Sequence, residues 1–287
     1  MHLAILLGML GLATSWRYFW SITARSNRWR HALTAFLLPP LLLCTSAIAV
    51  VWMGPHGLMV WGYEGLLSYG LAWAFLGWIL VALLRLSYAG WQMVSQIQTY
   101  PLACLHHSSE LADPAQTVRM LNISDLFVAQ VGFWRPELVV TQGLLQELST
   151  QQLAAVFAHE QAHNLYHDTF WFFWLGWIRG FTTWLPKTTA IWQELLLLRE
   201  LRADAWAAQQ SDPLLLAESL LMVGQQNSVL FTEDFYAAFS DVLPPSRLVQ
   251  RIEALLELTN SIDHTDCWSW RYLLLALLPL SIVPFHF

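Results

Sequence analysis

Three long apolar stretches dominate the first third of the chain. They run from Leu3 to about Ile22, within Ala32–Met53, and from about Leu66 to Leu84. A bilayer core needs about 20 predominantly apolar residues per helix, so each stretch is long enough to cross it. We therefore expect three transmembrane helices in residues 1–92, and we expect Arg17 in the first helix to snorkel to an interface.

A shorter apolar stretch, Tyr272–Phe287, predicts a fourth transmembrane helix in residues 269–287. It contains two prolines, and the second stretch contains Pro39 and Pro40, which membrane helices absorb as kinks. A cleaved signal peptide is the alternative for the first stretch. The arginines follow that stretch instead of preceding it, which favours an uncleaved anchor.

The composition supports a membrane protein. Of 287 residues, 56% are hydrophobic and 12% are charged, whereas soluble domains have about 45–50% and about 25%. The net charge of -6 gives no electrostatic footprint for nucleic acid, and 17 tryptophans indicate contact with a lipid interface. Cys44, Cys104 and Cys267 form no C-x-x-C, so we expect neither a disulfide framework nor a cysteine zinc site.

The arginines predict the orientation, because short loops rich in Lys and Arg stay in the cytoplasm. Arg25, Arg28 and Arg30 lie between the first two stretches, whereas residues 54–65 contain no Lys or Arg. The first loop is therefore expected inside and the N-terminus outside. Everything after Arg85 is then delivered to the cytoplasmic side.

Residues 93–268 hold most of the acidic residues and predict a cytoplasmic domain large enough for its own core. Residues 126–131 and Glu137–Thr141 flank a turn and predict two short strands. Ser149, with Gln152 three residues later, predicts a capping box at the start of a helix. The expected fold is mainly α: about four transmembrane helices plus a cytoplasmic α+β domain with a small β-sheet.

That helix carries the sequence H-E-x-x-H at His159, Glu160 and His163. Two histidines four residues apart lie on one helix face, so both imidazoles can reach one Zn²⁺ with the glutamate beside it. The alternative is that hydrogen bonds in the core satisfy both histidines.

A catalytic zinc needs a third protein ligand, and three candidates follow: His167, Glu194 and Glu200. On a straight helix, His167 would lie about 12 Å from His159, too far to share one ion. Asp204 lies one turn after Glu200 and could accept the free ring N–H of a ligating histidine.

These residues resemble the membrane-embedded gluzincin peptidases, a group that includes the HtpX-type, CAAX-prenyl and beta-lactam sensor-transducer peptidases. The resemblance covers about residues 126–260, and includes Gly132–Pro136, Leu138–Thr141 and Asp168, a position that the family often fills with Asp. It implies a zincin-like fold for the cytoplasmic domain and a zinc metalloendopeptidase. The roles that it implies are zinc ligands at His159, His163 and Glu200, a catalytic base at Glu160 and a supporting contact from Asp204.

Two departures from the family accompany this resemblance. The family often has His-Pro before a late Arg-Ile, whereas this chain has Pro244-Pro245 before Arg251-Ile252, which leaves the role of that segment open. No sensor module follows the last apolar stretch, so a beta-lactam receptor in one chain is not expected.

A tryptophan-rich segment at about residues 169–185 separates the metal helix from Glu200. His163 and Glu200 must lie on the same side of the membrane to bind one ion, so the chain between them crosses the membrane either not at all or twice. The segment is too short for two membrane spans. We therefore expect an interfacial helix, with a re-entrant or an ordinary buried helix as the alternatives. This would hold the zinc cleft close to the bilayer.

The expected function is zinc-dependent hydrolysis of peptide bonds at the cytoplasmic face of a bacterial plasma membrane. Zinc would activate water and Glu160 would take its proton. We expect substrate to pair with the strand at Leu138–Thr141, and Tyr166, Tyr236 and His264 are candidate oxyanion donors.

The expected partners are the lipid bilayer and a polypeptide, either a damaged membrane protein or a regulator such as a cytoplasmic repressor. A partner subunit could supply sensing. The alternative function is a non-catalytic membrane subunit with a structural zinc site.

Overall fold

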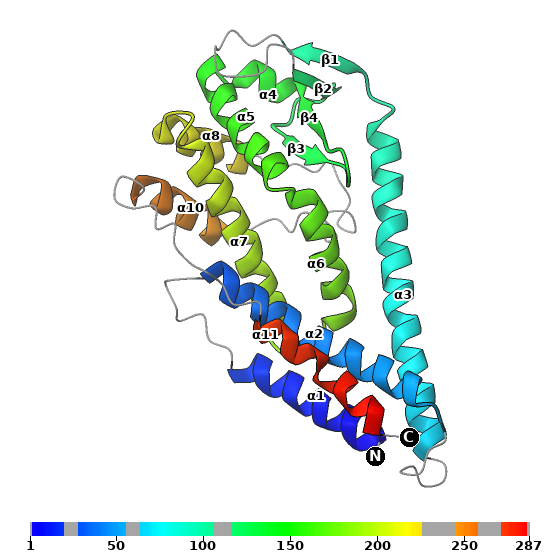
Figure 1. The fold of residues 1–287 in the computed structure, drawn as a ribbon. Coiled ribbons are helices and arrows are strands. Elements are labelled where there is room, and N and C mark those ends of the chain that lie inside the picture. The colour runs from blue at the N-terminus through cyan, green and yellow to red at the C-terminus, as the bar shows by residue number, and fades with distance from the viewer. Residues whose placement is uncertain are drawn as a thin grey trace. The chain divides into compact units, whose positions relative to one another are not determined.

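The computed structural model describes residues 2–19, 28–55, 64–105, 116–225, 245–257 and 271–285, and it is mostly helical with one small sheet (Figure 1). These residues form two compact units. Unit 1 comprises residues 1–85, 177–195 and 264–287, and unit 2 comprises residues 86–176 and 196–263. The sequence predicts residues 177–195 as part of the cytoplasmic domain, whereas the structure groups them with the N-terminal helices.

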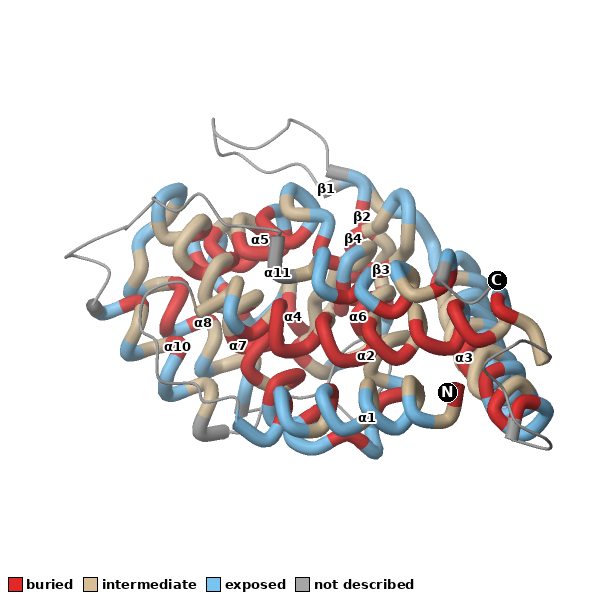
Figure 2. Tube along the Cα trace, turned by 60° about the horizontal axis from the view of Figure 1, so that its bottom comes forward, coloured by how far each residue is buried: buried red, intermediate tan, exposed pale blue. Residues whose placement is uncertain are grey.

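Among the residues that the structure describes, two helices are long and apolar enough to cross a membrane. They are α2 (Arg28–Met53) and the part of α3 (Glu64–Ile97) that begins at Gly65. Figure 2 shows α2 as a mainly buried helix, and most side chains of α3 are exposed. The second and third apolar stretches, which were expected to cross the membrane, are thus confirmed as long helices.

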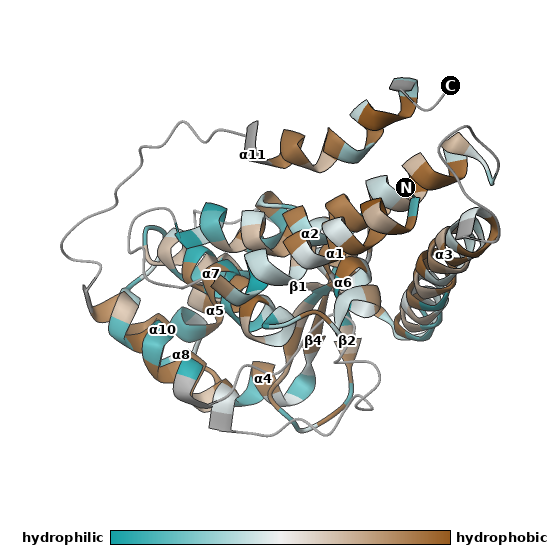
Figure 3. Ribbon diagram, turned by 90° about the horizontal axis from the view of Figure 1, so that it is seen from below, coloured by the Kyte–Doolittle hydropathy of each residue, from teal (hydrophilic) through white to brown (hydrophobic). Residues whose placement is uncertain are grey.

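The first and fourth stretches are shorter helices. The first forms α1 (His2–Phe19), and the last forms α11 (Arg271–Leu274) and the 3₁₀ helix η1 (Leu275–Phe285). Figure 3 shows η1 as a strongly apolar ribbon. Because a 3₁₀ helix rises about 2 Å per residue, α11 and η1 together extend about 28 Å. Their crossing of a membrane stays a prediction.

Prolines in these helices free backbone carbonyls, which side chains of neighbouring helices satisfy. Pro40 has no N–H for the carbonyl of Phe36 four residues earlier, and Arg17 Nη2 donates to that carbonyl at 3.0 Å. In the same way, Thr45 Oγ1 donates to Ala276, whose 3₁₀ partner would be Pro279. Arg17 is fully buried, so the expectation that it snorkels is wrong: its guanidinium is used inside the unit.

The tryptophan-rich segment forms α6 (Asp168–Thr182), which continues through a turn into α7 (Thr188–Ala207). Trp177 Nε1 donates to the carbonyl of Ile79 in α3 at 3.0 Å, and Phe181 packs edge-on against Phe75. Leu185 in the turn belongs to a buried cluster with residues of α1 and α2. This half of the segment thus packs among the apolar helices of unit 1, and its placement at a membrane interface stays a prediction.

Unit 2 contains a four-stranded sheet in the order β1-β2-β4-β3. The strands β2 and β4 are parallel, and both edge strands are antiparallel to their neighbours. Two strands were predicted: β4 agrees residue for residue, and β3 begins two residues later than expected. The strand bounds are β1 (Leu102–Leu105), β2 (Gln116–Leu121), β3 (Val128–Val131) and β4 (Glu137–Thr141).

Alternating side chains of β4 build the two faces of the sheet, as a period of two requires. Leu138 and Val140 join a core with the short helix α4 (Gln142–Glu147) and α5 (Thr150–Leu165). Val139 joins a second cluster with the end of α3. Because β4 lies between β2 and β3, the expectation that substrate pairs with its edge is wrong; among the strands that the structure describes, the edge strand that contacts α5 is β3.

The remaining helices of unit 2 cover α5. They are α8 (Pro213–Gln225) and α10 (Pro245–Glu257), with bounds taken from the residues that the structure describes. Leu216 of α8 and Leu255 of α10 join Ala155 of α5 in one buried cluster. This packing brings α10 to the helix that carries the H-E-x-x-H.

Candidate metal centre

The helix α5 begins with the predicted capping box. Ser149 Oγ accepts from the backbone N–H of Gln152 at 3.3 Å, and the side chain of Gln152 accepts from the N–H of Ser149 at 2.9 Å. The helix then turns His159, Glu160 and His163 inward, and all three are buried. Burial of polar groups needs compensation, so their partners define the site.

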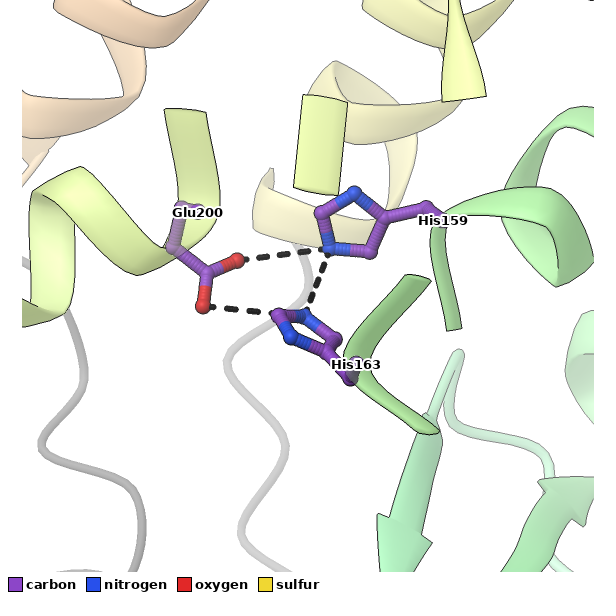
Figure 4. A group of neighbouring side chains, drawn as sticks. All are labelled: His159, His163 and Glu200. Atoms are coloured by element: carbon purple, nitrogen blue, oxygen red, sulfur yellow. Dashed lines mark hydrogen bonds and ion pairs between the residues drawn. The ribbon is translucent and has the colours of Figure 1, made fainter. Parts of the chain in front are cut away.

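Glu200 of α7 completes a three-residue group with the two histidines (Figure 4). The Nε2 atoms of His159 and His163 lie 3.1 Å apart. Oxygens of Glu200 lie 3.4 Å from His159 Nε2 and 3.8 Å from His163 Nε2. One ligand atom from each residue lies within 4.8 Å of the others, so the group could hold a metal ion.

Carboxylates behind the histidines orient both rings. Asp204 Oδ1 lies 2.9 Å from His159 Nδ1, and Asp168 Oδ2 lies 2.8 Å from His163 Nδ1. Such contacts place the ring proton on Nδ1 and turn the lone pair on Nε2 toward the metal position. Two facing lone pairs repel each other unless a cation or a proton lies between them.

The spacing of the donor atoms fits zinc. Ligands about 2.0–2.1 Å from a tetrahedral Zn²⁺ are about 3.3 Å from each other. The 3.1 Å between the two Nε2 atoms is close to this value, and Glu200 places Oε2 3.4 Å from His159 and Oε1 3.8 Å from His163. Two imidazoles and one carboxylate are also the donor set of known catalytic zinc sites.

Three arginines balance the carboxylates around this group. Arg251 of α10 donates to both oxygens of Asp204 at 2.7 Å, and its Nη1 lies 3.3 Å from Glu200. Arg199 donates to Glu200 at 2.7 Å, and Arg202 forms an ion pair with Asp168. Each carboxylate behind or within the ligand group therefore has a cationic partner.

These charges determine the pKa values of the buried acids. Burial alone would raise the pKa of Glu200, but Arg199 and Arg251 hold it well below its ordinary value. The pKa of Asp204 is likewise lowered, because Arg251 outweighs burial. Both groups are therefore carboxylates at neutral pH.

His159 and Glu160 shift in the opposite direction. Burial alone would lower the pKa of His159, but Asp204 and Glu200 raise it to about 9. The pKa of Glu160 is raised, chiefly by burial. Its Oε2 accepts from the backbone N–H of Gln130 in β3 at 3.1 Å, which links the glutamate to the free edge strand.

The other candidate ligands do not join the group. His167 is exposed and follows the end of α5 in a left-handed conformation (φ 52°), so it is not on the metal helix at all. Glu194 is in unit 1, where Arg28 Nη2 donates to it at 2.5 Å. The ring of Tyr166 lies under the guanidinium of Arg202. Tyr236 and His264 lie outside the described residues.

Sequence reasoning missed the roles of Arg202 and Arg251, and gave no role to Asp168. The position of Asp168, five residues after His163, was the available signal. The Arg251-Ile252 pair was noticed, but its partner Asp204 is 47 residues away in sequence. No local pattern connects the two.

Residues 95–194 match the family model described as Peptidase family M48. This segment includes the sheet and the H-E-x-x-H, and it ends before Glu200. The match supports the resemblance to M48 metallopeptidases, without distinguishing the HtpX-type subgroup. No curated protein and no solved structure matches the chain.

Proposed function

We propose that this chain is a membrane-bound zinc endopeptidase whose zinc ligands are His159, His163 and Glu200. The carrying observation is the convergence of their three donor atoms within 4.8 Å, with both histidines backed by carboxylates. The match to M48 peptidases supports the same class of enzyme.

The residues around the ligands have chemically distinct tasks. A zinc ion bound there would polarise the scissile carbonyl and lower the pKa of water. Glu160 would accept a proton from that water at its carboxylate and pass it to the leaving amine. Its raised pKa suits this role, because a general base works best when its pKa approaches the working pH.

The edge of β3 is the proposed place for the substrate backbone. Its other edge pairs with β4, and the N–H of Gln130 already points to Glu160. An extended peptide added to this edge would pair mainly through backbone groups, which leaves sequence specificity loose. Such a protease suits either quality control of damaged membrane proteins or cleavage of a regulator, with sensing by a partner subunit in the second case.

The membrane location is part of the same proposal. The two long apolar helices support it, and the arginine distribution favours a cytoplasmic metal centre in a bacterial plasma membrane. Labelling of single cysteines at Val60 and at the exposed Glu218, in a chain without its native cysteines, tests the orientation. Labelling of both from the same side would contradict it.

Cleavage of casein by the detergent-purified chain tests the enzymatic proposal. We expect wild type and the control Glu147→Gln, an exposed glutamate of α4, to cleave, and Glu160→Gln to be inactive. Equal cleavage by wild type and Glu160→Gln would remove Glu160 from the mechanism. Failure of wild type to cleave, with zinc bound, would favour the alternative of a non-catalytic subunit with a structural zinc site.

A further inference from the structure

A rigid turn at residues 132–136 joins β3 to β4 and exposes a tryptophan. Trp134 is 79% exposed, and Arg135 beside it is exposed as well. Gly132 has a φ of 134°, and a Cβ there would lie 3.0 Å from the carbonyl oxygen of Arg135. The backbone conformation therefore requires glycine, and the turn presents its tryptophan in a fixed position.

Aromatic rings of α6 brace this turn from inside. The ring of Phe133 lies 5.1 Å from Phe170 and 4.8 Å from Phe173, and the ring of Trp134 lies 5.3 Å from Phe170. Trp171, next along α6, is 58% exposed. The turn and the start of α6 thus form one aromatic platform, defined as residues 132–136, Phe170 and Trp171.

The helix α3 indicates where the membrane surface lies on unit 2. Its 34 residues extend about 50 Å, well beyond a hydrocarbon core of about 30 Å. Arg85 ends the uncharged part, and the exposed Tyr88 and Trp91 follow with their rings 6.0 Å apart. Tyrosine and tryptophan next to a charged residue are typical of the headgroup layer.

The platform is attached to this same end of α3. Met93 and Ile97, within two turns after Trp91, share a buried cluster with Val131, and the turn begins at the next residue. Val131 is also the last residue of β3. A short, packed connection therefore ties the aromatic turn to the helix segment that leaves the lipid.

We propose that the aromatic platform inserts into the lipid headgroup layer, with Trp134 and Trp171 as anchors and Arg135 paired with lipid phosphate. Indole rings prefer this layer because one part is apolar and the N–H is polar, and arginine binds phosphate through two parallel N–H donors. The inference rests on the membrane location proposed above. It fixes the β3 edge beside the bilayer, so the favoured substrates are chain segments at the membrane surface.

Quenching of a fluorophore by lipids tests the platform in the full chain. A cysteine-free chain receives one cysteine by Trp134→Cys or Trp171→Cys, is labelled with an environment-sensitive dye, and is reconstituted in nanodiscs of phosphatidylcholine and phosphatidylglycerol. Trp78→Cys in the middle of the α3 stretch and Gln151→Cys at the exposed start of α5 are the matched controls. Zinc content and casein cleavage are measured on each labelled protein.

We expect emission at 134 and 171 to be lost with lipids that carry a nitroxide near the headgroup, and to resist iodide in water. The dye at 78 should respond to a deep nitroxide, and the dye at 151 only to iodide. If iodide quenches the dyes at 134 and 171 while the dye at 78 responds to the deep nitroxide, the platform proposal is wrong and the membrane span of α3 stands. Iodide quenching at 78 as well would overturn both, whereas casein cleavage reports the peptidase proposal separately.

Discussion

Arg251 binds Asp204 through two parallel hydrogen bonds, from Nε and from Nη2, each 2.7 Å long. Both side chains are buried, and Asp204 in turn faces His159. Arg251 thereby connects α10 to Asp204 of α7, and through Asp204 to His159 of α5. The contact supplies the positive charge that keeps Asp204 and Glu200 ionised.

Replacing this arginine should destabilise unit 2. In Arg251→Gln, two buried carboxylates lose their shared cation, and breaking a buried pair in this way costs about 3–5 kcal/mol. Thermal unfolding of the purified chain, with and without zinc, measures the loss. Arg247→Gln, one turn earlier on the same helix, is the control and should change little; equal midpoints for both variants would refute the structural role of Arg251.

The glutamate of the H-E-x-x-H should affect turnover and not metal content. In Glu160→Gln we expect zinc to be retained and kcat to fall about 10²–10⁴-fold, the range for loss of a general base. Metal analysis and peptide cleavage on the same preparation separate the two effects. Loss of zinc in this variant would instead make Glu160 part of the metal's binding site.

The three ligands should be individually necessary for zinc. We expect wild type to bind about one zinc per chain, and Glu200→Ala and His163→Ala to lose it. His167→Ala should keep it, because His167 is exposed and off the metal helix. Zinc retained in Glu200→Ala would assign the third ligand elsewhere.

The two carboxylates behind the histidines should tune affinity. Asp204→Asn and Asp168→Asn preserve shape and remove the charge that orients each ring, so zinc affinity measured above pH 9, where His159 is largely deprotonated, should fall about 10–100-fold in each. Competition with a chelator of known affinity measures this. Unchanged affinity in both variants would show that the 2.9 and 2.8 Å contacts do not support the ligands.

Zinc binding should become tighter as pH rises from 7 to 9. Without metal, the pKa of His159 is raised to about 9, so this imidazole is protonated at neutral pH and must release its proton to bind zinc. Affinity should therefore increase about tenfold per pH unit and level off above the pKa. Asp204→Asn lowers that pKa and should flatten the slope; a wild-type affinity independent of pH would contradict the assignment.

Local sequence patterns predicted α5 and its two histidines, because every feature that defines them lies within one helix. The capping box, the inward face of α5 and the paired histidines all arise within one helix. Glu200 followed from spacing and resemblance, and the structure brings it to the histidines. The apolar stretches likewise predicted α2 and α3 by length and composition alone.

Contacts distant in sequence could not be predicted in the same way. The short strands β1 and β2 are defined by their pairing with other strands and not by a local sequence pattern. β2 pairs in parallel with β4, and no turn sequence predicts a parallel pair. The sequence predicted that Arg17 lies at a membrane interface. No local pattern shows that Pro40 leaves the carbonyl of Phe36 free to accept from Arg17. The position of the tryptophan-rich segment depends on Ile79 and Phe75, a hundred residues earlier in the chain.

The hairpin formed by α6 and α7 has a consequence for protein engineering. The chain leaves α5 after His163, passes through residues 177–195 of unit 1, and returns with Glu200. A fragment truncated to residues 93–268 would keep His159, His163 and Glu200 and would expose the apolar residues 177–195 to water. Expression of this fragment alone should therefore yield aggregates, and co-expression with the missing helices is the way to recover it.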